Sequence, residues 1–323
     1  MQAKITALGT YVPERIVDNH YFESIIDTND EWIVSRTGIS TRRFAAEFEY
    51  TTHLCAAAVE NLVEENNVAL DDVDFIIVAT VTPDQIMPSV ASQVQEKLGL
   101  HHAGAIDIAA ACAGFAYGIM LANGLIAAGT HRKVLVFGAE TLSKFTNFED
   151  RTSCILFGDG AGVVLVEAAP KGNILAGVTG SQGDGGKDLY MSHMRKQING
   201  QDIITDNKIH QNGRAVFKWA VNTVSAQMPK LAERAGLKLN DIDWFIPHSA
   251  NLRIIEALCS QSGFPLEKTL ESITLFGNTS SASIPLALHR GLREGKVKKG
   301  DKLMLIGFGG GLVYAGVVLE WGV

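Results

Sequence analysis

Three residues of types that support nucleophilic chemistry adjoin apolar segments of this chain: Cys112, His248 and Asn278. Cys112 stands between the apolar stretch 106–110 and the small-residue run AGFAYGIM, which predicts a buried strand followed by a close-packed helix. Unpaired N–H groups and the macrodipole at a helix N-terminus favour a thiolate. The other interpretation of Cys112 is a small buried apolar residue, since free cysteine is among the most buried residue types.

His248 and Asn278 leave a similar choice open. His248 follows the apolar segment DWFIP and Asn278 precedes a predicted helix, so a core histidine and a helix N-cap are the simpler interpretations. A cysteine with a distant histidine and asparagine is, however, a general arrangement for nucleophilic catalysis. The stretch GFGGG (307–311) predicts either a tight connection with positive φ or a backbone N–H close to a developing oxyanion.

The elements that must position these residues occur twice along the chain. LDDVDFII (70–77) resembles LNDIDWFI (239–246), and KVLVFGAE (133–140) falls on KLMLIGFG (302–309) at the same displacement of 169 positions. Each half then ends in AGVVL. Because strands alternating with helices favour a sheet covered on both faces, we predict a duplicated α/β/α/β/α layered fold with two pseudo-twofold-related halves.

The repeat places the candidate residues at one rim of this fold. The predicted halves are 1–172, which carries Cys112, and 173–323, which carries the histidine and the asparagine. At the same displacement Cys112 matches Ser281, so the two strand-to-helix turns should approach each other near the axis. Sites in such folds lie beyond the carboxyl ends of strands, and we therefore expect Cys112, His248 and Asn278 to lie together.

Composition excludes several functional classes. The 323 residues are 46% hydrophobic and 20% charged, which is typical of a soluble globular protein, and the net charge of −7 argues against nucleic-acid binding. Four cysteines without metal-ligand spacing indicate a reducing cytoplasm. The N-terminal residues show no signal-peptide pattern, and Asp107 and Asn123 interrupt the apolar stretch 106–129, so we expect no membrane insertion.

These motifs together resemble the β-ketoacyl-acyl carrier protein synthase III enzymes of the thiolase superfamily, over essentially the whole chain. In most members of that family a glutamine stands where this chain has Ser249, a position that is not one of the reacting groups. The motifs that carry the resemblance are GTYVP, DEWIVSRTGISTRR (30–43), AACAGF, GDGAG (158–162), PHSAN, GNTSS and GFGGG.

The resemblance implies the initiating condensation of bacterial type II fatty acid synthesis, an acyltransferase reaction between an acyl-CoA primer, acetyl or short branched, and malonyl-acyl carrier protein. Cys112 would hold the acyl group as a thioester, while His248 and Asn278 stabilise the enolate left by decarboxylation. The backbone N–H groups of Cys112 and Gly310 would form an oxyanion hole. The resemblance implies a homodimer without metal or cofactor, in which acyl-CoA is a substrate.

The resemblance also assigns binding residues. Trp32 and Arg151 would hold the CoA adenine between them by stacking, and Met87 would close the acyl pocket of the dimer partner. The implied CoA-binding set is Thr28, Trp32, Arg36, Arg151, Gly213 and Asn251. The implied acyl-pocket set is Met87, Leu142, Phe157, Leu189 and Phe308. The implied carrier-protein contacts are Arg214, Lys218 and Arg253.

Other functions remain open at this stage. One is a related condensing enzyme of the superfamily, of the hydroxymethylglutaryl-CoA synthase or the polyketide and quinolone type, and another is a cysteine thioesterase. An asparagine in place of a carboxylate favours a neutral imidazole, which suits enolate stabilisation better than water activation. Some members of the superfamily are non-catalytic, but those lack the nucleophile that this chain retains as Cys112.

Overall fold

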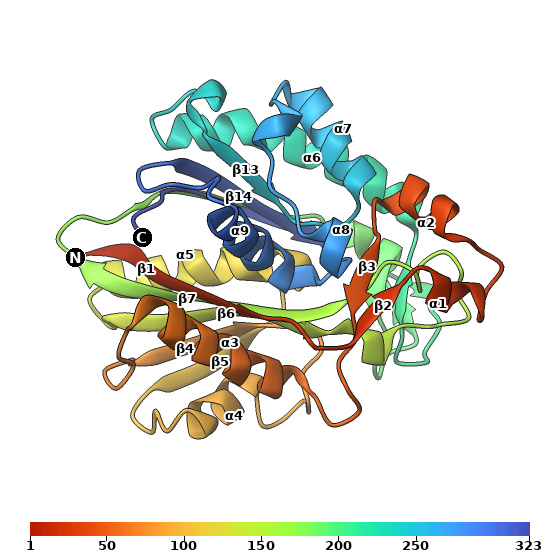
Figure 1. Cartoon of the computed structure of the whole chain (residues 1–323), viewed down its shortest axis with the longest axis horizontal. Coiled ribbons are helices and arrows are strands. Elements are labelled where there is room, and N and C mark those ends of the chain that lie inside the picture. Colours follow the sequence, from red (N-terminus) through yellow and green to blue (C-terminus); the bar gives the residue numbers. More distant parts are fainter.

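Two sheets form the centre of the molecule in the computed structural model, which describes residues 1–323, and each sheet takes its strands from a different part of the chain (Figure 1). The five-stranded sheet has the order β1-β7-β6-β4-β5, and the four-stranded sheet has the order β13-β14-β15-β8. The first contains β1 (Gln2–Tyr11), β4 (Phe75–Ala79), β5 (Gly104–Ile108), β6 (Lys133–Thr141) and β7 (Asp159–Ala169). The second contains β8 (Ile174–Ser181), β13 (Trp244–Pro247), β14 (Lys302–Gly309) and β15 (Val313–Glu320).

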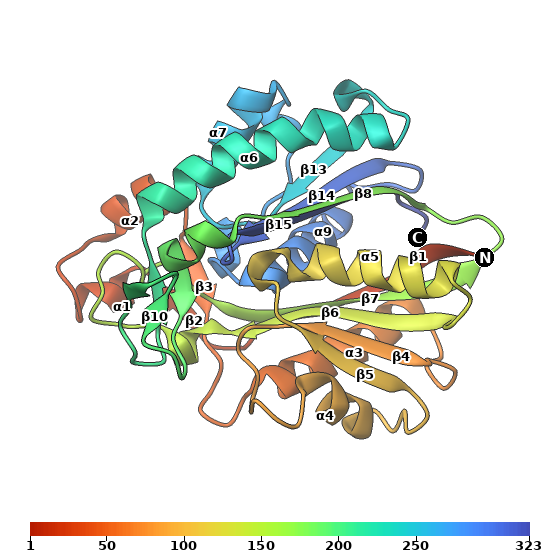
Figure 2. The ribbon, with the colours of Figure 1, turned by 180° about the vertical axis from the view of Figure 1, so that it is seen from behind.

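Helices cover both faces of both sheets and complete five layers (Figures 1 and 2). Helices α5 (Gly114–Ala127) and α9 (Ser283–Arg293) lie between the sheets, in one apolar cluster with side chains of both. Helices α3 (Thr51–Asn66) and α4 (Val90–Lys97) cover the outer face of the first sheet, and α6 (Gly213–Arg234) and α7 (Leu252–Ser262) cover that of the second. The predicted layered fold is confirmed.

The sequence explains why the central layer fits between two sheets. Strand β6 is buried along its whole length, which agrees with the apolar run 134–139 that forms most of it. Helix α5 is rich in glycine and alanine, and a Cβ at Gly118 would lie 2.6 Å from Cγ1 of Val136 in β6. The small residues therefore let the helix approach the sheet closely.

The duplicated turns have the same backbone geometry. Ala111 begins the 3-10 turn η1 (Ala111–Ala113) with φ 45°, and Ser280, 169 positions later, begins η6 (Ser280–Ala282) with φ 49°. A positive φ is unusual for residues other than glycine and costs about 1–3 kcal/mol. The two turns contact each other in the interior, as the repeat predicts.

One expectation about the opening stretch is wrong. Strand β5 is not buried, because it lies at the edge of its sheet and pairs only with β4. Ile106 is 46% exposed as a consequence. The helix that follows Cys112 is confirmed.

Short elements surround the rim that carries the candidate residues. The helix α2 packs against the start of α7, and α8 contacts β3. No helix has both the length and the apolar composition needed to cross a membrane. The short elements are β2 (Ile16–Asp18), α1 (His20–Glu23), α2 (Asp30–Thr37), β3 (Thr41–Arg43), β9 (Leu189–Met191), β10 (Gln197–Ile198), β11 (Gln201–Asp202), β12 (Ile209–Gln211) and α8 (Ile273–Phe276), with 3-10 turns at η2 (Leu142–Phe145), η3 (Gly183–Asp188), η4 (Leu239–Asp241) and η5 (Leu266–Lys268).

Candidate active site

A mostly apolar cavity of about 360 Å³ brings the three candidate residues together. Cys112 lies in η1 ahead of α5, His248 follows β13, and Asn278 lies between α8 and η6. All three side chains line the cavity, although 166 positions separate the cysteine from the asparagine. The placement expected from the repeat is therefore confirmed.

Two glycines of GFGGG make room for Cys112. A Cβ at Gly307 would lie 2.5 Å from the carbonyl oxygen of Cys112, and a Cβ at Gly309 would lie 2.8 Å from its Sγ. Neither glycine has a positive φ, which occurs in this stretch only at Gly311. Of the two interpretations of the stretch, close approach thus accounts for Gly307 and Gly309, and the hairpin connection accounts for Gly311.

Burial controls the protonation of Cys112. The residue is 8% exposed, and burial raises the pKa of its thiol to about 12. The carboxylate of Glu140 raises this pKa further, while the Ser280 hydroxyl opposes the shift. Burial thus opposes the thiolate that the helix N-terminus favours, and in the protein without substrate it favours the protonated thiol.

His248 is a neutral imidazole whose Nδ1 is hydrogen-bonded to Ser283. The side chain is 1% exposed, and burial lowers its pKa to about 3. Nδ1 lies 2.7 Å from Oγ of Ser283, and the ring of Phe308 packs edge-on at a centroid distance of 5.3 Å. The Ser283 hydroxyl is also 2.7 Å from the Ser280 carbonyl oxygen. The carbonyl oxygen can only accept, so the single hydrogen of the Ser283 hydroxyl is donated there, and Nδ1–H then donates to Oγ of Ser283. The ring is a donor at Nε2 only when the hydroxyl turns from the carbonyl oxygen to Nδ1.

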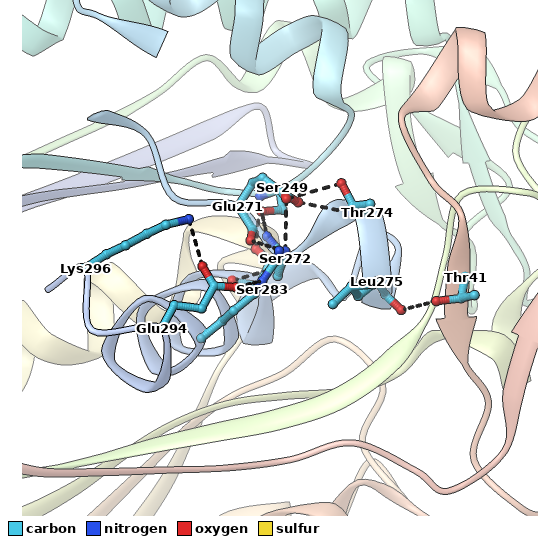
Figure 3. A network of polar contacts seen from close by, with 10 residues as sticks. Thr41, Ser249, Glu271, Ser272, Thr274, Leu275, Ser283, Glu294 and Lys296 are labelled. Carbon is cyan, nitrogen blue, oxygen red and sulfur yellow. Dashed lines mark hydrogen bonds and ion pairs between the residues drawn. The ribbon is translucent and has the colours of Figure 1, made fainter. Parts of the chain in front are cut away.

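The serine that contacts His248 belongs to a hydrogen-bonded network with Ser249 and Ser272, which Figure 3 shows. The Ser249 N–H donates to Oγ of Ser283 at 3.2 Å, and Ser249 Oγ accepts from the Ser272 N–H at 3.0 Å. The Ser272 hydroxyl donates to the Ser283 carbonyl oxygen at 3.0 Å. In Figure 3, Thr41 donates to the Leu275 carbonyl oxygen, at 2.8 Å, and so fixes α8. Ser249 is thus a buried support of the site.

Asn278 is fixed through both its backbone and its side chain. Its N–H donates to the Leu156 carbonyl oxygen at 2.8 Å, and its carbonyl oxygen accepts from the Gly158 N–H at 3.0 Å. Its Oδ1 accepts from the Ser280 N–H at 2.9 Å. Since the oxygen of the amide is engaged, Nδ2 is the group left to donate to a ligand in the cavity.

The apolar wall contains most of the residues assigned to the acyl pocket. Leu142, Phe157, Leu189 and Phe308 line the same cavity as Cys112, and Gly310 borders it as well. Met87 does not line it and is 85% exposed. The segment 85–88 that carries Met87 is exposed, so any role of Met87 in an acyl pocket requires a second chain.

The residues assigned to CoA divide into two groups. Gly213 and Asn251 line the cavity, and Oγ1 of Thr28 is buried without a hydrogen-bond partner. The Arg151 guanidinium lies 4.7 Å from the centre of the Trp32 ring, so the two stack directly on each other. The expected gap for an adenine is closed in this structure, and the sandwich would need Arg151 to move. The guanidinium of Arg36, also in this set, is 6.0 Å from the Trp32 ring centre.

The residues assigned to the carrier protein are all exposed. Arg214 and Lys218 lie one turn apart on α6. Arg253 is less free, because its Nε donates to the Ser35 carbonyl oxygen at 3.0 Å. No group of three or more His, Cys, Asp or Glu side chains is arranged to hold a metal ion.

Sequence reasoning missed several groups of this site. Ser280 lines the cavity and fixes Asn278, Ser283 contacts His248, and Glu140 lies behind them, fully buried. The repeat offered a signal for Glu140, because the matching residue of the second half is Gly309. The two serines offered none, since serine near a helix start is common for local reasons.

Known proteins match the whole chain. Residues 106–183 match the family model described as 3-oxoacyl-[acyl-carrier-protein] synthase III, and residues 232–321 match its C-terminal counterpart. The chain is 54% identical to the β-ketoacyl-[acyl-carrier-protein] synthase III 2 of Halalkalibacterium halodurans, over 99% of this chain and 97% of that protein. It is 52% identical to the protein of the same name from Bacillus subtilis, over 99% of each.

Solved structures agree with these matches. The crystal structure of β-ketoacyl-[acyl-carrier-protein] synthase III from Thermus thermophilus has a TM-score of 0.95 to this chain, with 44% identity over 99% of each chain. That of the 3-oxoacyl-[acyl-carrier-protein] synthase III of Aquifex aeolicus has a TM-score of 0.92, with 40% identity, and covers 99% of this chain and 100% of its own. The chain therefore belongs to the β-ketoacyl-acyl carrier protein synthase III family of thiolase-fold enzymes.

Proposed function

We propose that Cys112, His248 and Asn278 carry out the reaction of this family on this chain. A member of the family is an acyltransferase, the initiating condensing enzyme of fatty acid synthesis, and it acts on acyl-CoA and malonyl-acyl carrier protein. The observation that carries the assignment is the convergence of the three side chains on one largely apolar cavity. The cavity offers an acyl chain an apolar surface and offers developing negative charge a few polar donors.

In the first half-reaction Sγ of Cys112 attacks the acyl-CoA carbonyl carbon. The new S–C bond forms as the bond to the CoA sulfur breaks, and the thiol proton ends on the CoA sulfur. A thiol suits this step because it is both a nucleophile and a leaving group. The backbone N–H groups of Cys112 and Gly310, which border the cavity, would donate to the tetrahedral oxyanion.

In the second half-reaction malonyl-acyl carrier protein loses CO₂ and leaves an enolate. Its carbon attacks the acyl thioester, the S–C bond to Cys112 breaks, and the cysteine takes up a proton. Asn278 Nδ2 and His248 Nε2 would donate to the enolate oxygen, the histidine when Ser283 donates to its Nδ1. Loss of one such donor typically lowers a rate by about 10²–10³.

The assigned binding residues extend the site to the surface. We assign Thr28, Trp32, Arg36 and Arg151 to the CoA nucleotide and Gly213 and Asn251 to the pantetheine arm, an assignment supported by the unpartnered Thr28 hydroxyl and by the two cavity-lining residues. Arg214, Lys218 and Arg253 would form the basic edge for the acidic carrier protein.

We further propose a cytoplasmic homodimer with two duplicated halves, 1–172 and 173–323. The edge strand β5 with exposed Ile106, and the exposed Ile86 and Met87, are apolar surface that a second chain would cover. Met87 would then close the partner's acyl pocket. The four cysteines are all unpaired and buried, which suits a reducing compartment.

The intact mass of the protein after incubation with acyl-CoA tests the nucleophile. Cys112→Ala should form no acyl adduct, whereas Cys154→Ala and Cys259→Ala, which also remove buried thiols, should keep it. An adduct that persists in Cys112→Ala contradicts the assignment. A wild type that forms the adduct and releases free acid, but makes no β-ketoacyl product, would instead be a thioesterase.

Two further variants separate the half-reactions. His248→Ala and Asn278→Ala should slow decarboxylation of malonyl-acyl carrier protein by about 10²–10³ and should slow acylation of Cys112 less. If His248→Ala loses acylation and keeps decarboxylation, the histidine is mainly a base for the thiol, and its role in the second half-reaction is wrong.

A further inference from the structure

A fully buried carboxylate lies directly behind the active site. Glu140, near the end of β6, is 0% exposed and accepts five hydrogen bonds. Three come from the strand-end segment after β4 and reach Oε2: the Thr80 hydroxyl at 3.1 Å, the Val81 N–H at 3.1 Å and the Thr82 hydroxyl at 2.6 Å. Two come from the η6 turn and reach Oε1: the Ser280 hydroxyl at 3.0 Å and the Ser281 hydroxyl at 3.1 Å. The Ser281 hydroxyl shares its single hydrogen between Oε1 and the Ala79 carbonyl oxygen, which lies at 2.9 Å.

The fold itself does not require a carboxylate here. The position that matches Glu140 in the second half is Gly309, at the end of β14. The two strand ends face equivalent turns, since Glu140 contacts Ser281 and Gly309 contacts the matching Cys112. Burying a carboxylate is unfavourable unless it is well bonded, and one half of the molecule manages without any side chain at this place. The carboxylate therefore has a task beyond holding the fold.

Its hydrogen bonds lead to Asn278. The Ser280 hydroxyl donates to Glu140, and the N–H of the same Ser280 donates to Oδ1 of Asn278 at 2.9 Å. Ser280 holds a φ of 49°, a conformation that needs support from its surroundings. If Ser280 turned, its N–H would leave Oδ1, and the amide of Asn278 would be free to rotate.

We propose that Glu140 is a positioning residue for the condensation, whose carboxylate holds Ser280 so that Nδ2 of Asn278 points into the cavity. The proposal rests on the role of Asn278 proposed above. The two matching strand ends would then serve different purposes. Gly309 leaves space for Cys112, and Glu140 supports the turn next to Asn278.

Glu140→Gln tests the proposal with little change in side-chain size. The Val81 N–H can only donate, so the oxygen of the new amide should remain on that side and its NH₂ group should face Ser280 and Ser281. There the amide would donate to the two serine hydroxyls, whereas the carboxylate accepts from them. We expect the decarboxylation kcat to fall about 10–100-fold, a part of the loss caused by removing a donor outright. The KM for malonyl-acyl carrier protein should stay within about twofold, and the rate of Cys112 acylation should not fall, because loss of the Glu140 charge lowers the pKa of the thiol.

Ser280→Ala and Ser281→Ala form a matched pair. Each removes one hydroxyl from Oε1 of Glu140, at 3.0 and 3.1 Å, but only Ser280 also bonds Asn278. Ser281→Ala removes in addition a hydrogen bond to the Ala79 carbonyl oxygen, so it is the more disruptive of the two for the fold. Ser280→Ala should slow decarboxylation about tenfold, and Ser281→Ala should leave it within about twofold. Equal effects would overturn the proposal. If Glu140→Gln fails to fold, this pair decides the question.

A double-mutant cycle shows whether Glu140 acts through Asn278. In the Asn278→Ala background, Glu140→Gln should cause no further loss of decarboxylation, because the group that it positions is gone. Additive losses would overturn the proposal. If Asn278→Ala alone leaves decarboxylation unchanged, the assigned role of Asn278 fails instead, so the two failures are distinguishable.

Discussion

Replacement of Gly309 by alanine should disable the nucleophile without removing it. The new Cβ would lie 2.8 Å from Sγ of Cys112, 3.1 Å from its Cβ and 3.3 Å from its backbone nitrogen. A carbon–sulfur contact is comfortable only about 1 Å farther away, judged by carbon–carbon contacts of about 3.5–4.0 Å. Sγ must therefore move by about 1 Å or the β14 end must shift. A displacement of this size in a reacting group costs about 10²-fold in rate.

Single-turnover acylation with acyl-CoA, followed by the intact mass of the protein, measures this loss directly. We expect the acylation rate of Gly309→Ala to fall about 10²-fold, while overpacking lowers the free energy of unfolding by about 1–3 kcal/mol. Gly124→Ala is the control, since this glycine lies in the helix that begins behind Cys112 and its Cβ would meet nothing within 4 Å. Acylation of Gly309→Ala within about threefold of the wild type would refute the argument.

Four other variants test separate parts of the molecule. Burial raises the pKa of Asp159 from 3.8 to about 6, so the folded state binds this proton more tightly than the unfolded chain. The free energy of unfolding of the wild type, measured by urea unfolding, should therefore fall by about 3 kcal/mol between about pH 4 and about pH 7.5, relative to the same change in Asp159→Asn. Trp32→Ala should raise the KM for acyl-CoA about tenfold at unchanged kcat, and an unchanged KM would remove Trp32 from the CoA site. Lys218→Glu should raise the KM for malonyl-acyl carrier protein, most strongly at low salt, and a salt-independent KM would place docking elsewhere. The wild type should accept isobutyryl- and isovaleryl-CoA besides acetyl-CoA, and Met87→Phe should lower kcat/KM for the branched primers about 10–200-fold more; equal losses would refute this role.

The internal repeat is the reason that so much of the architecture is readable from sequence. Two pairs of segments match at the same displacement of 169 positions, and these matches are sufficient to predict the layers and to place Cys112 opposite Ser281. Side-chain types at the strand ends then predicted which residues share the cavity. The boundary between 172 and 173 remains a prediction of the repeat.

The departures have physical causes that a sequence pattern does not contain. An apolar segment does not reveal whether its strand lies at the centre or the edge of a sheet, which is why Ile106 was expected to be buried. A helix N-terminus suggests a low thiol pKa, but the degree of burial of Cys112 depends on Gly309 and the hairpin around it. The stacking of Arg151 on Trp32 involves two segments that are far apart in the chain and share no pattern.

The duplication also explains how one backbone arrangement serves two purposes. Ala111 and Ser280 open their turns with nearly the same φ, 45° and 49°, and α5 and α9 begin at matching positions. The strand end opposite each turn differs. Gly309 leaves the space in front of Cys112 free, whereas the carboxylate of Glu140 occupies the matching space and bonds Ser281. The two turns thus differ in two ways, in their own residue, Cys112 against Ser281, and in the strand-end residue opposite each of them, and only the first turn has both a thiol and free space in front of it.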